Sequence, residues 1–439
     1  GIVKRTRKYL PQTLKRMRRI RHLVQKKEND KAFEELLQLP DVLSKDSGRK
    51  VIFIIDEFDR MEQFNLKDIY TVFSHEIMVQ KDTMYIVSSS DPSKAEDIFR
   101  QKLSLLFGNF ETLEVLSFSF SESTEFITRC LSGITIDEDY IKFLIRITDG
   151  HPFYLNVISN EIKRHVRYPQ NRVSESDLVD ALTNLLFYPS GSLHQHFMLE
   201  LSRFNKGCSF YVYLNVLIAI ANGYKKVGTI ASFIEKNKEE TKKVLQRLHD
   251  DNVIHRSGYF YMITDTLLKF WLRYVYGRKI VALGVDDGLD EGKFREAVVD
   301  MLDSACHEQY KELTKRVEEL LRSFNNDVVQ INAKRMKCPN FQDVYLRATN
   351  GRIYPLYAKS NKTRWLCQVA DTEVEEEDVQ TLVNDSKRIR KKVNKRILIT
   401  PFGISLNAKL LAKQQKIEIW NLRNLNFIFD LYDKPKIIV

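Results

Sequence analysis

The segment Lys50–Met61, which reads KVIFIIDEFDRM, most constrains what this chain can fold into. Five consecutive apolar residues, mostly β-branched, predict a strand that is buried on both faces, as in a parallel sheet. Asp56 and Glu57 follow this run directly. Two carboxylates are unsuited to a core, but they suit the carboxyl-terminal edge of a parallel sheet, where ligands bind. The segment therefore predicts an α/β layer with charged groups at its edge.

The neighbouring segments agree with such a layer. Asp68–Gln80 has the periodicity of an amphipathic helix, and Thr83–Val87 predicts a second strand that ends in three serines, Ser88 to Ser90. Thr112–Phe118 (TLEVLSF) predicts a third strand. Strands that alternate with helices indicate a doubly wound α/β fold. Residues 1–120 are therefore predicted to form a partial α/β core that includes a basic N-terminal helix.

After residue 120 the periodicity becomes helical, and residues 121–190 are predicted to form a helical domain. Asp137–Thr148 has helical spacing and ends at Asp149-Gly150-His151-Pro152, after which a new helix begins. Glycine ends helices and proline starts them, so this turn joins two helices.

Residues 191–284 have the element order of a winged helix, in which helices are followed by a β-ribbon. The acidic, glycine-containing segment Val285–Gly292 predicts a linker. The segments that predict the winged helix are Tyr211–Ala221, Val227–Lys236, Glu239–Asp250 and the ribbon Val253–Ile263.

Residues 293–439 predict a third, α/β domain. Its expected helices are Phe294–Phe324 and Glu376–Lys391, and its expected strands are Val328–Asn332, Asp343–Ala348, Arg352–Ala358, Trp365–Ala370, Ile397–Thr400 and Ile417–Trp420.

The charge of the chain predicts a polyanionic partner. Its 439 residues include 69 Lys and Arg against 58 Asp and Glu, a net charge of +11. Eleven of these cations and no acid lie between Lys4 and Lys27, and seven more lie in Lys387–Arg396. DNA is the expected partner, whereas a protein partner or self-association is the alternative. Each cluster taken alone also fits a solvated helix face.

Several classes of protein are not supported. The five cysteines are scattered and form no CxxC pair, which argues against a disulfide framework and against a cysteine-based zinc site. No apolar run reaches the roughly 18 residues that would span a bilayer, so no membrane association is expected. The expected compartment is reducing and intracellular: cytoplasmic, or nuclear in a eukaryote. No H-E-x-x-H or G-x-S-x-G motif occurs.

An acidic pair after a buried strand is the Walker B arrangement of nucleotide-hydrolysing proteins. In it, Asp56 would hold Mg²⁺ through the water shell of the ion, and Glu57 would orient the attacking water. Ser89 or Ser90, at the end of the adjacent strand, would reach the γ-phosphate. ATP and Mg²⁺ are therefore the expected cofactors, with Asp56 as the metal residue. The alternative is that the acidic pair simply caps a helix.

The motif that usually accompanies Walker B is missing. No G-x-x-x-x-G-K-[ST] phosphate loop occurs in the chain, and Gly1 stands at its start. We expect that this sequence begins inside a domain whose nucleotide-binding beginning precedes Gly1. ATPase activity is then expected of the intact protein. A protein that has no phosphate loop is the alternative.

In combination, these motifs resemble the archaeal-type ATPases of the STAND/AAA+ group of P-loop NTPases. The segments that carry the resemblance are VIFIIDEFDRM, the serine-rich end of the next strand, the turn at Asp149–Phe153, and DTLLKFW at Asp265–Trp271. The resemblance implies an ATPase core with a helical lid, a winged helix and a C-terminal domain similar to restriction-type nucleases. It also implies that Gly150, His151 and Pro152 contact the nucleotide. A plain junction between two helices remains the alternative for these three residues.

The C-terminal domain departs from the nuclease pattern that this resemblance implies. Restriction-type nucleases use an Asp, a Glu and a Lys, but the matching positions hold Pro355, Gln368 and Ala370. Without carboxylates to hold a metal ion, that mechanism cannot proceed. The domain is therefore interpreted as a nuclease-like fold used for binding or structure. An active nuclease that uses the shifted acids is the alternative; those acids are Asp343, Asp371 and Glu373.

The winged helix offers candidate DNA contacts, although many winged helices contact only proteins. Lys243 and Arg247 lie at i and i+4 and share one face of the expected recognition helix, and the wing residues are expected to touch the DNA backbone. The candidates are Lys242, Lys243, Gln246 and Arg247 on the helix, and His255, Arg256 and Tyr259 on the wing.

The sequence thus predicts an ATP-dependent, DNA-associated switch. Nucleotide held between core and lid would set the position of the winged helix and the C-terminal domain, which would engage DNA or a partner. The competing hypothesis is a non-catalytic DNA-binding or scaffold subunit whose ATPase site has decayed. A phosphate loop upstream of Gly1 would favour the enzyme.

Overall fold

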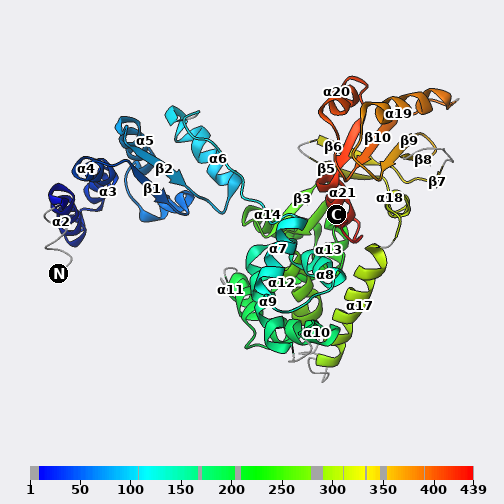
Figure 1. Cartoon of the computed structure of the whole chain (residues 1–439), viewed down its shortest axis with the longest axis horizontal. Helices are drawn as coiled ribbons and strands as arrows, with labels where there is room; N and C mark the ends of the chain where they lie inside the picture. Colours follow the sequence, from blue (N-terminus) through cyan, green and yellow to red (C-terminus); the bar gives the residue numbers. More distant parts are fainter. Residues whose placement is uncertain are drawn as a thin grey trace. The chain divides into compact units, whose positions relative to one another are not determined.

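The protein is a mixed α/β chain that divides into two compact units, Gly1–Val115 and Leu116–Val439, as seen in a computed structural model (Figure 1). The residues that the structure describes are 9–106, 108–166, 171–202, 209–277, 290–309, 311–331, 334–346, 353–389 and 391–438.

The first unit is built on a parallel pair of strands. Strands β1 (Val51–Ile55) and β2 (Thr83–Val87) run in register, with Ile55 opposite Val87. The predicted helix between them is confirmed as α5 (Ile69–Val79). The remaining elements are α2 (Pro11–Gln25), α3 (Asn29–Leu37), α4 (Leu39–Ser47), the 3-10 helix η1 (Phe58–Phe64), α6 (Pro92–Gln101) and the short η2 (Ser104–Leu106).

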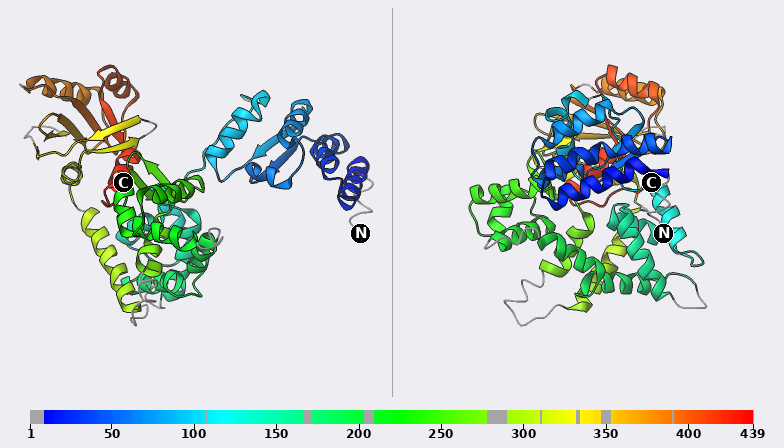
Figure 2. Two further views of the ribbon diagram at one scale, coloured as in Figure 1. Left: turned by 180° about the vertical axis from the view of Figure 1, so that it is seen from behind. Right: turned by 90° about the vertical axis from the view of Figure 1, so that its left-hand side faces the viewer.

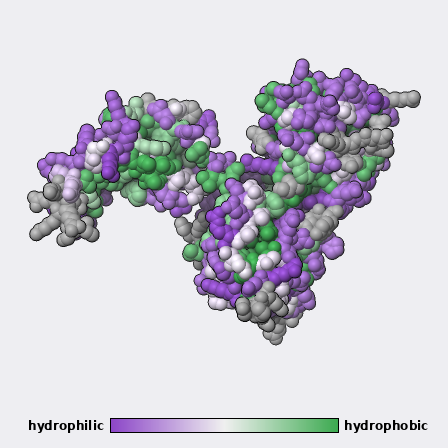
Figure 3. All heavy atoms as spheres, viewed as in Figure 1, coloured by the Kyte–Doolittle hydropathy of each residue, from purple (hydrophilic) through white to green (hydrophobic). Residues whose placement is uncertain are grey.

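The prediction that β1 is buried on both faces is wrong. Ile52 and Ile54 are 62% and 65% exposed, and Met84 of β2 is 61% exposed on the same face. The opposite face packs on the helices, where Ile55, Tyr85 and Val87 border a small core around Phe73. Only one face is covered because, among the described residues, the sheet has two strands and its helices lie on one side. Figure 3 shows apolar side chains gathered over this part of the unit.

The predicted third strand, Thr112–Phe118, is also wrong. This segment forms no strand, and Leu113 and Val115 are 81% and 95% exposed. A strand satisfies its backbone groups only through a neighbouring strand. Within the described part of the first unit, β1 and β2 pair only with each other, so the apolar pattern of the segment has no partner.

The second unit begins with a helical core in which Leu144, Phe197, Leu217 and Trp271 are fully buried. The predicted helix before the Gly-His-Pro turn is confirmed as α8 (Glu138–Thr148). Its other elements are α7 (Phe120–Cys130), α9 (Pro152–His165), α10 (Glu175–Leu182), the π-helical turn η3 (Thr183–Phe187), α11 (Ser192–Ser202) and α12 (Ser209–Ala221).

The helices and the ribbon expected of the winged-helix segment form in the predicted order. Hairpin β3–β4 turns at Ser257-Gly258 and pairs Ile254 with Ile263. The predicted linker is described only at its end, because residues 285–289 lie outside the described residues and α17 begins at Glu291. The elements are α13 (Val227–Phe233), α14 (Lys238–Asp250), β3 (Ile254–Ser257), β4 (Phe260–Ile263), α15 (Thr266–Trp271), the π-helical turn η4 (Leu272–Tyr276) and α17 (Glu291–Gln309).

A five-stranded mixed sheet of order β11-β10-β9-β8-β7 organises the C-terminal part. Helices α19 and α20 share a small core with one face of the sheet, and α18 and α21 share a larger core with the other (Figure 2). Strand β6 and helices α20 and α21 were not predicted. The elements are α18 (Leu313–Arg322), β5 (Asp327–Ile331), β6 (Lys334–Cys338), β7 (Asp343–Leu346), β8 (Ile353–Lys359), β9 (Arg364–Ala370), α19 (Glu376–Arg388), β10 (Lys395–Thr400), α20 (Leu406–Gln414), β11 (Glu418–Asn421) and α21 (Leu422–Leu431).

The tip of hairpin β3–β4 is attached to strand β5. The backbone N–H of Tyr259 donates to the carbonyl of Val328 at 3.0 Å, and the Ser257 hydroxyl donates to the carbonyl of Gln330 at 2.9 Å. Behind the hairpin, the buried Lys225 side chain forms an ion pair with Asp433 at 2.8 Å. These contacts tie the winged-helix segment to the C-terminal sheet.

Two buried thiols predict a loss of stability at alkaline pH. Burial raises the pKa of Cys338 and of Cys367 from 9.0 to about 12. The folded state therefore keeps both protons above pH 9, whereas the unfolded state releases them. Between pH 9 and 10.5 each thiol should lower the free energy of unfolding by about 2 kcal/mol.

Urea unfolding at several pH values, followed by tryptophan fluorescence, measures this loss. Trp365 and Trp420 lie in the same core as the two thiols and report on it. The Cys367→Ala variant is expected to lose only the part of the alkaline slope that comes from Cys367, because other buried thiols and tyrosines with a raised pKa also contribute. A slope equal to that of the unsubstituted protein would contradict the assignment.

Candidate functional site

The predicted carboxylates lie where strand β1 ends. Because β1 and β2 are parallel and in register, the residues after Ile55 meet the residues after Val87. Two backbone hydrogen bonds join these segments: Ser88 N–H donates to the carbonyl of Ile55 at 2.9 Å, and Phe58 N–H donates to the carbonyl of Ser88 at 3.0 Å. The site is therefore built on the carboxyl-terminal edge of the strand pair.

Asp56 is exposed at this edge. One of its carboxylate oxygens, Oδ1, accepts hydrogen bonds from the Ser88 hydroxyl and from the backbone N–H of Glu57 at 3.0 Å. Sequence reasoning named Ser89 and Ser90 but missed Ser88. The parallel register was the signal available, since it places the first residue after β2 opposite the first residue after β1.

Glu57 adopts a left-handed backbone conformation, with φ of 52°. A non-glycine residue in this region costs roughly 1–2 kcal/mol, a strain often found at functional sites. The Ser90 hydroxyl donates to Glu57 Oε1, and Arg60 Nε lies 2.9 Å from Oε2. The structure thus brings Asp56, Glu57 and Ser90 together.

Ser89, the other predicted serine, instead contacts Asp59. Its hydroxyl donates to Asp59 Oδ1 at 2.6 Å, and Lys94 Nζ lies 3.4 Å from Oδ2. Asp59 is only 4% exposed. Burial by itself raises the pKa of Asp59, but the hydrogen bonds from Ser89 and Lys94 outweigh it, so the pKa lies below its ordinary value. Asp59 was missed because its burial depends on the fold of η1.

The oxygen donors at this edge suit Mg²⁺ bound largely through water. Asp56, Ser88 and Ser90 offer carboxylate and hydroxyl oxygens, the hard ligands that Mg²⁺ prefers. The described residues include no cluster of three or more His, Cys, Asp or Glu side chains placed to hold a metal ion. Mg²⁺ commonly keeps several waters and takes phosphate oxygens as its other ligands, so the donor set fits Mg²⁺ held together with a phosphate.

The predicted lid turn lies in the second unit. Asp149 and Gly150 both have positive φ, 54° and 70°, which ends α8 and reverses the chain. A Cβ on Gly150 would lie 2.4 Å from the carbonyl oxygen of Phe118, so only glycine fits here. His151 precedes α9 and stacks near Tyr154, with ring centroids 4.6 Å apart, and Pro152 is the first residue of α9.

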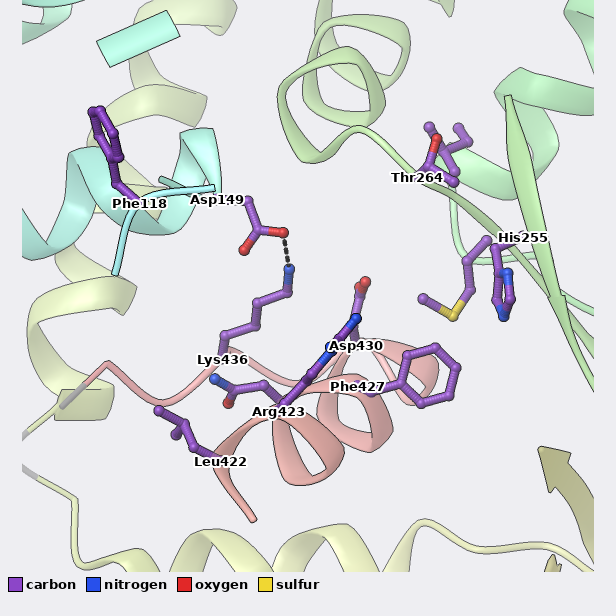
Figure 4. A pocket seen from close by; sticks show the side chains of 12 residues that line it. Phe118, Asp149, His255, Thr264, Leu422, Arg423, Phe427, Asp430 and Lys436 are labelled. Carbon is purple, nitrogen blue, oxygen red and sulfur yellow. Dashed lines mark ion pairs between the residues drawn. The ribbon is translucent and has the colours of Figure 1, made fainter. Parts of the chain in front are cut away.

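A cavity of about 500 Å³ lies beside this turn. Its walls come from Phe118 and Asp149 of the predicted lid region, from the hairpin and from helix α21. Figure 4 shows Lys436 extending toward Asp149, with which it forms an ion pair at 2.9 Å. His255, a predicted DNA contact, lines the same cavity, and its ring lies 5.9 Å from that of Phe427. Partial desolvation at this wall, and then the nearby His249, lower the pKa of the otherwise exposed His255, which favours the neutral imidazole.

The predicted recognition helix is α14, and most of its candidate side chains are engaged. Lys242 pairs with Glu239 at 2.8 Å, and Gln246 donates to Asp250 at 2.7 Å. The Arg247 guanidinium lies over the Tyr213 ring at 5.4 Å. Lys243 is exposed.

The wing candidates are exposed but sit on a hairpin whose tip contacts β5. The Arg256 guanidinium packs over Tyr261 at 5.7 Å, and the Tyr259 side chain is 56% exposed. The hairpin therefore has one protein neighbour already, and DNA contact by His255, Arg256 and Tyr259 stays a prediction.

The nuclease-like positions come together in the C-terminal sheet. Pro355 on β8 pairs directly with Gln368 on β9. Gln368 is 1% exposed, and neither of its amide atoms has a hydrogen-bond partner among the described residues. Of the alternative acids, Asp343 forms an ion pair with Lys359 at 3.2 Å. Asp371 and Glu373 are exposed after β9.

Within the described residues, no helix combines the length and the apolar character needed to cross a bilayer.

No protein-family model and no curated protein matches this chain. Among solved structures, the Walker-type ATPase PABY2304 of Pyrococcus abyssi is 19% identical, covers 54% of this chain and 67% of its own, and gives a TM-score of 0.40. The RuvB Holliday junction branch migration motor of Thermotoga maritima is 11% identical, with 55% and 84% covered and a TM-score of 0.29. Protein VC1899 from Vibrio cholerae is 10% identical, with 90% and 94% covered and a TM-score of 0.17. These TM-scores are low, and the similarities do not establish the family of this chain.

Proposed function

We propose that this chain is part of an ATP- and Mg²⁺-dependent switch of the archaeal-type STAND/AAA+ kind. In this proposal, nucleotide state controls how the winged-helix and C-terminal segments engage DNA or a partner. The proposal rests on one observation: Asp56 and Glu57 lie side by side at the carboxyl-terminal edge of a parallel strand pair, and each accepts a hydrogen bond from a serine of the next strand.

Each residue of this edge has a task in the proposal. Mg²⁺, when bound, would neutralise charge that develops on the phosphates. Asp56 would hold water of the metal shell through its carboxylate, which Ser88 orients. Glu57 would orient the attacking water and accept its proton.

Glu57 must leave Arg60 to do this. Their ion pair is partly exposed, with side chains 58% and 32% accessible, and exposed pairs contribute about 0–1 kcal/mol. Its release is therefore a small cost compared with the barrier of hydrolysis. Gly150, His151 and Pro152 are proposed to contact the nucleotide from the lid.

Mg²⁺-dependent binding of a fluorescent ATP analogue tests the proposal. We expect Asp56→Asn to weaken the Mg²⁺ dependence strongly, because the neutral amide holds the ordered waters of the metal less tightly than a carboxylate does. Asp97→Asn on α6 is the matched control, since Asp97 is also an exposed carboxylate of the first unit, and it should bind as the unsubstituted protein does.

If the intact protein neither binds nor hydrolyses ATP, the proposal is overturned. The competing function, a non-catalytic DNA-binding or scaffold subunit, would then be favoured. The contacts that hold the C-terminal part to the hairpin through Lys225 and Ser257 would suit such a role.

A further inference from the structure

We infer that the outer face of helix α2 is a docking surface for the phosphate backbone of duplex DNA. This surface is defined by three exposed side chains of α2, Lys15, Arg18 and Arg21, and by the exposed Lys26 that caps the end of the helix. It rests on the DNA association proposed above, but it lies on a helix that contributes nothing to the carboxylate edge. It therefore stands apart from the nucleotide chemistry.

The inner side of α2 fixes the helix to its neighbours. Arg16 Nη1 lies 3.2 Å from Glu35 of α3, and the mostly exposed Arg19 reaches the same carboxylate from the edge of this side, with Nε at 3.0 Å. The backbone N–H and the hydroxyl of Thr13 both donate to Asp46 of α4, at 2.7 and 2.9 Å. Contacts on one side leave the other side of the helix to solvent.

That outer side carries positive charge without a matching acid. No acidic residue occurs in α2. Within the described part of the chain, no carboxylate forms an ion pair with Lys15, Arg18 or Arg21, and Lys26 lies near Glu28, whose pKa it helps to lower. Several cations that lie close together without a paired carboxylate repel one another. Such a face is complementary to a polyanion.

The spacing of the cations matches a nucleic-acid backbone. Lys15, Arg18 and Lys26 follow one stripe of the helix, and Lys15 and Lys26 are about 16 Å apart along its axis. One strand of duplex DNA presents roughly five phosphates over that length. Several cations can therefore each meet a phosphate without bending the helix.

Duplex DNA fits this face better than a lipid surface does. A helix that lies in a membrane interface needs a broad apolar face. The large exposed apolar residues of α2 are Met17 and Val24. They are seven positions apart, so they form a narrow stripe on the flank of the helix rather than a broad apolar face. The centre of the outer face is cationic.

Fewer of the candidate DNA contacts in the winged-helix segment have a positive charge available for phosphate than do the cations of α2. Lys242 is paired with Glu239, and Arg247 packs on Tyr213. The hairpin tip contacts β5. The cationic face of α2 is therefore the stronger electrostatic surface for phosphate contact.

Fluorescence anisotropy with labelled duplex DNA over a range of salt concentrations tests this inference. The variant Lys15→Gln/Arg18→Gln/Arg21→Gln is expected to weaken binding more than about tenfold. It should also flatten the slope of log K against log salt by about 2–3, since each phosphate contact contributes about 0.9. The control Lys50→Gln/Lys67→Gln/Lys81→Gln removes the same charge from exposed sites of the same unit and should keep the slope.

The outcomes separate this inference from the proposed function. Equal losses in the two triple variants would overturn the inference in favour of a net-charge effect. An unaffected α2 variant together with a weakened Lys243→Gln variant would overturn it while DNA association stands. A chain that binds vesicles of anionic lipid but no DNA would overturn both the inference and the DNA part of the proposed function. Retained ATP binding and an unchanged thermal unfolding midpoint in the α2 variant would show that its fold is intact.

Discussion

In the intact protein, replacing Glu57 by Gln is expected to lower the rate of ATP turnover by roughly two orders of magnitude or more. The amide keeps the size of the side chain and can still accept a hydrogen bond from Ser90, but it cannot accept the proton of the attacking water. Nucleotide affinity should stay within about twofold, because the lost group acts mainly in the transition state. Phosphate release and equilibrium nucleotide binding, measured on the same preparation, check the two expectations.

Glu62→Gln provides the control for this substitution. Glu62 is another exposed acid of η1 and is paired with Lys102 rather than with any residue of the carboxylate edge. Its replacement should leave turnover unchanged. If Glu57→Gln hydrolyses ATP at the unsubstituted rate, Glu57 is not the base and the Walker B assignment fails.

Replacing Gly258 by Ala is expected to destabilise the second unit by about 3 kcal/mol or more. Gly258 has φ of +59°, where a side chain is strained, and a Cβ would lie 2.0 Å from the backbone carbonyl oxygen of Val328. A backbone atom cannot rotate away as a side chain can, so the hairpin must move off β5. The movement would break the hydrogen bond between Tyr259 N–H and Val328.

Gly133→Ala separates the clash from the backbone strain. Gly133 also has a positive φ, +82°, but a Cβ there would meet nothing within 4 Å. It should cost only about 1 kcal/mol. Urea unfolding of both variants measures the difference, and equal losses would show that the hairpin is not held tightly on β5.

The local pattern of the sequence was sufficient to predict most of the helices and strands. Strand Thr83–Val87 forms at the predicted residues, and the apolar run before Asp56 forms β1. Helix α8 ends at the predicted glycine turn because Asp149 and Gly150 adopt positive φ. Such features depend on residues that are close together in the chain, so periodicity and turn residues predict them.

The same patterns gave wrong predictions where strand formation or burial depends on a segment far away in the sequence. The apolar pattern of Thr112–Phe118 is that of a strand, yet the segment is exposed, since no neighbour within the described part of its unit supplies hydrogen bonds. Likewise, the run VIFII predicts two buried faces, but only one face of β1 is covered. Burial depends on what packs against a strand, which its own sequence does not specify.

Residue types and their order along the chain were thus enough to predict that acids and serines meet at one edge of a parallel strand pair. Tertiary structure alone decided which serine bonds to which acid: Ser88 to Asp56, Ser90 to Glu57 and Ser89 to the buried Asp59. It also decided that the hairpin rests on β5. These pairings join residues about 30 or more positions apart, and their geometry follows from strand register and packing rather than from local periodicity.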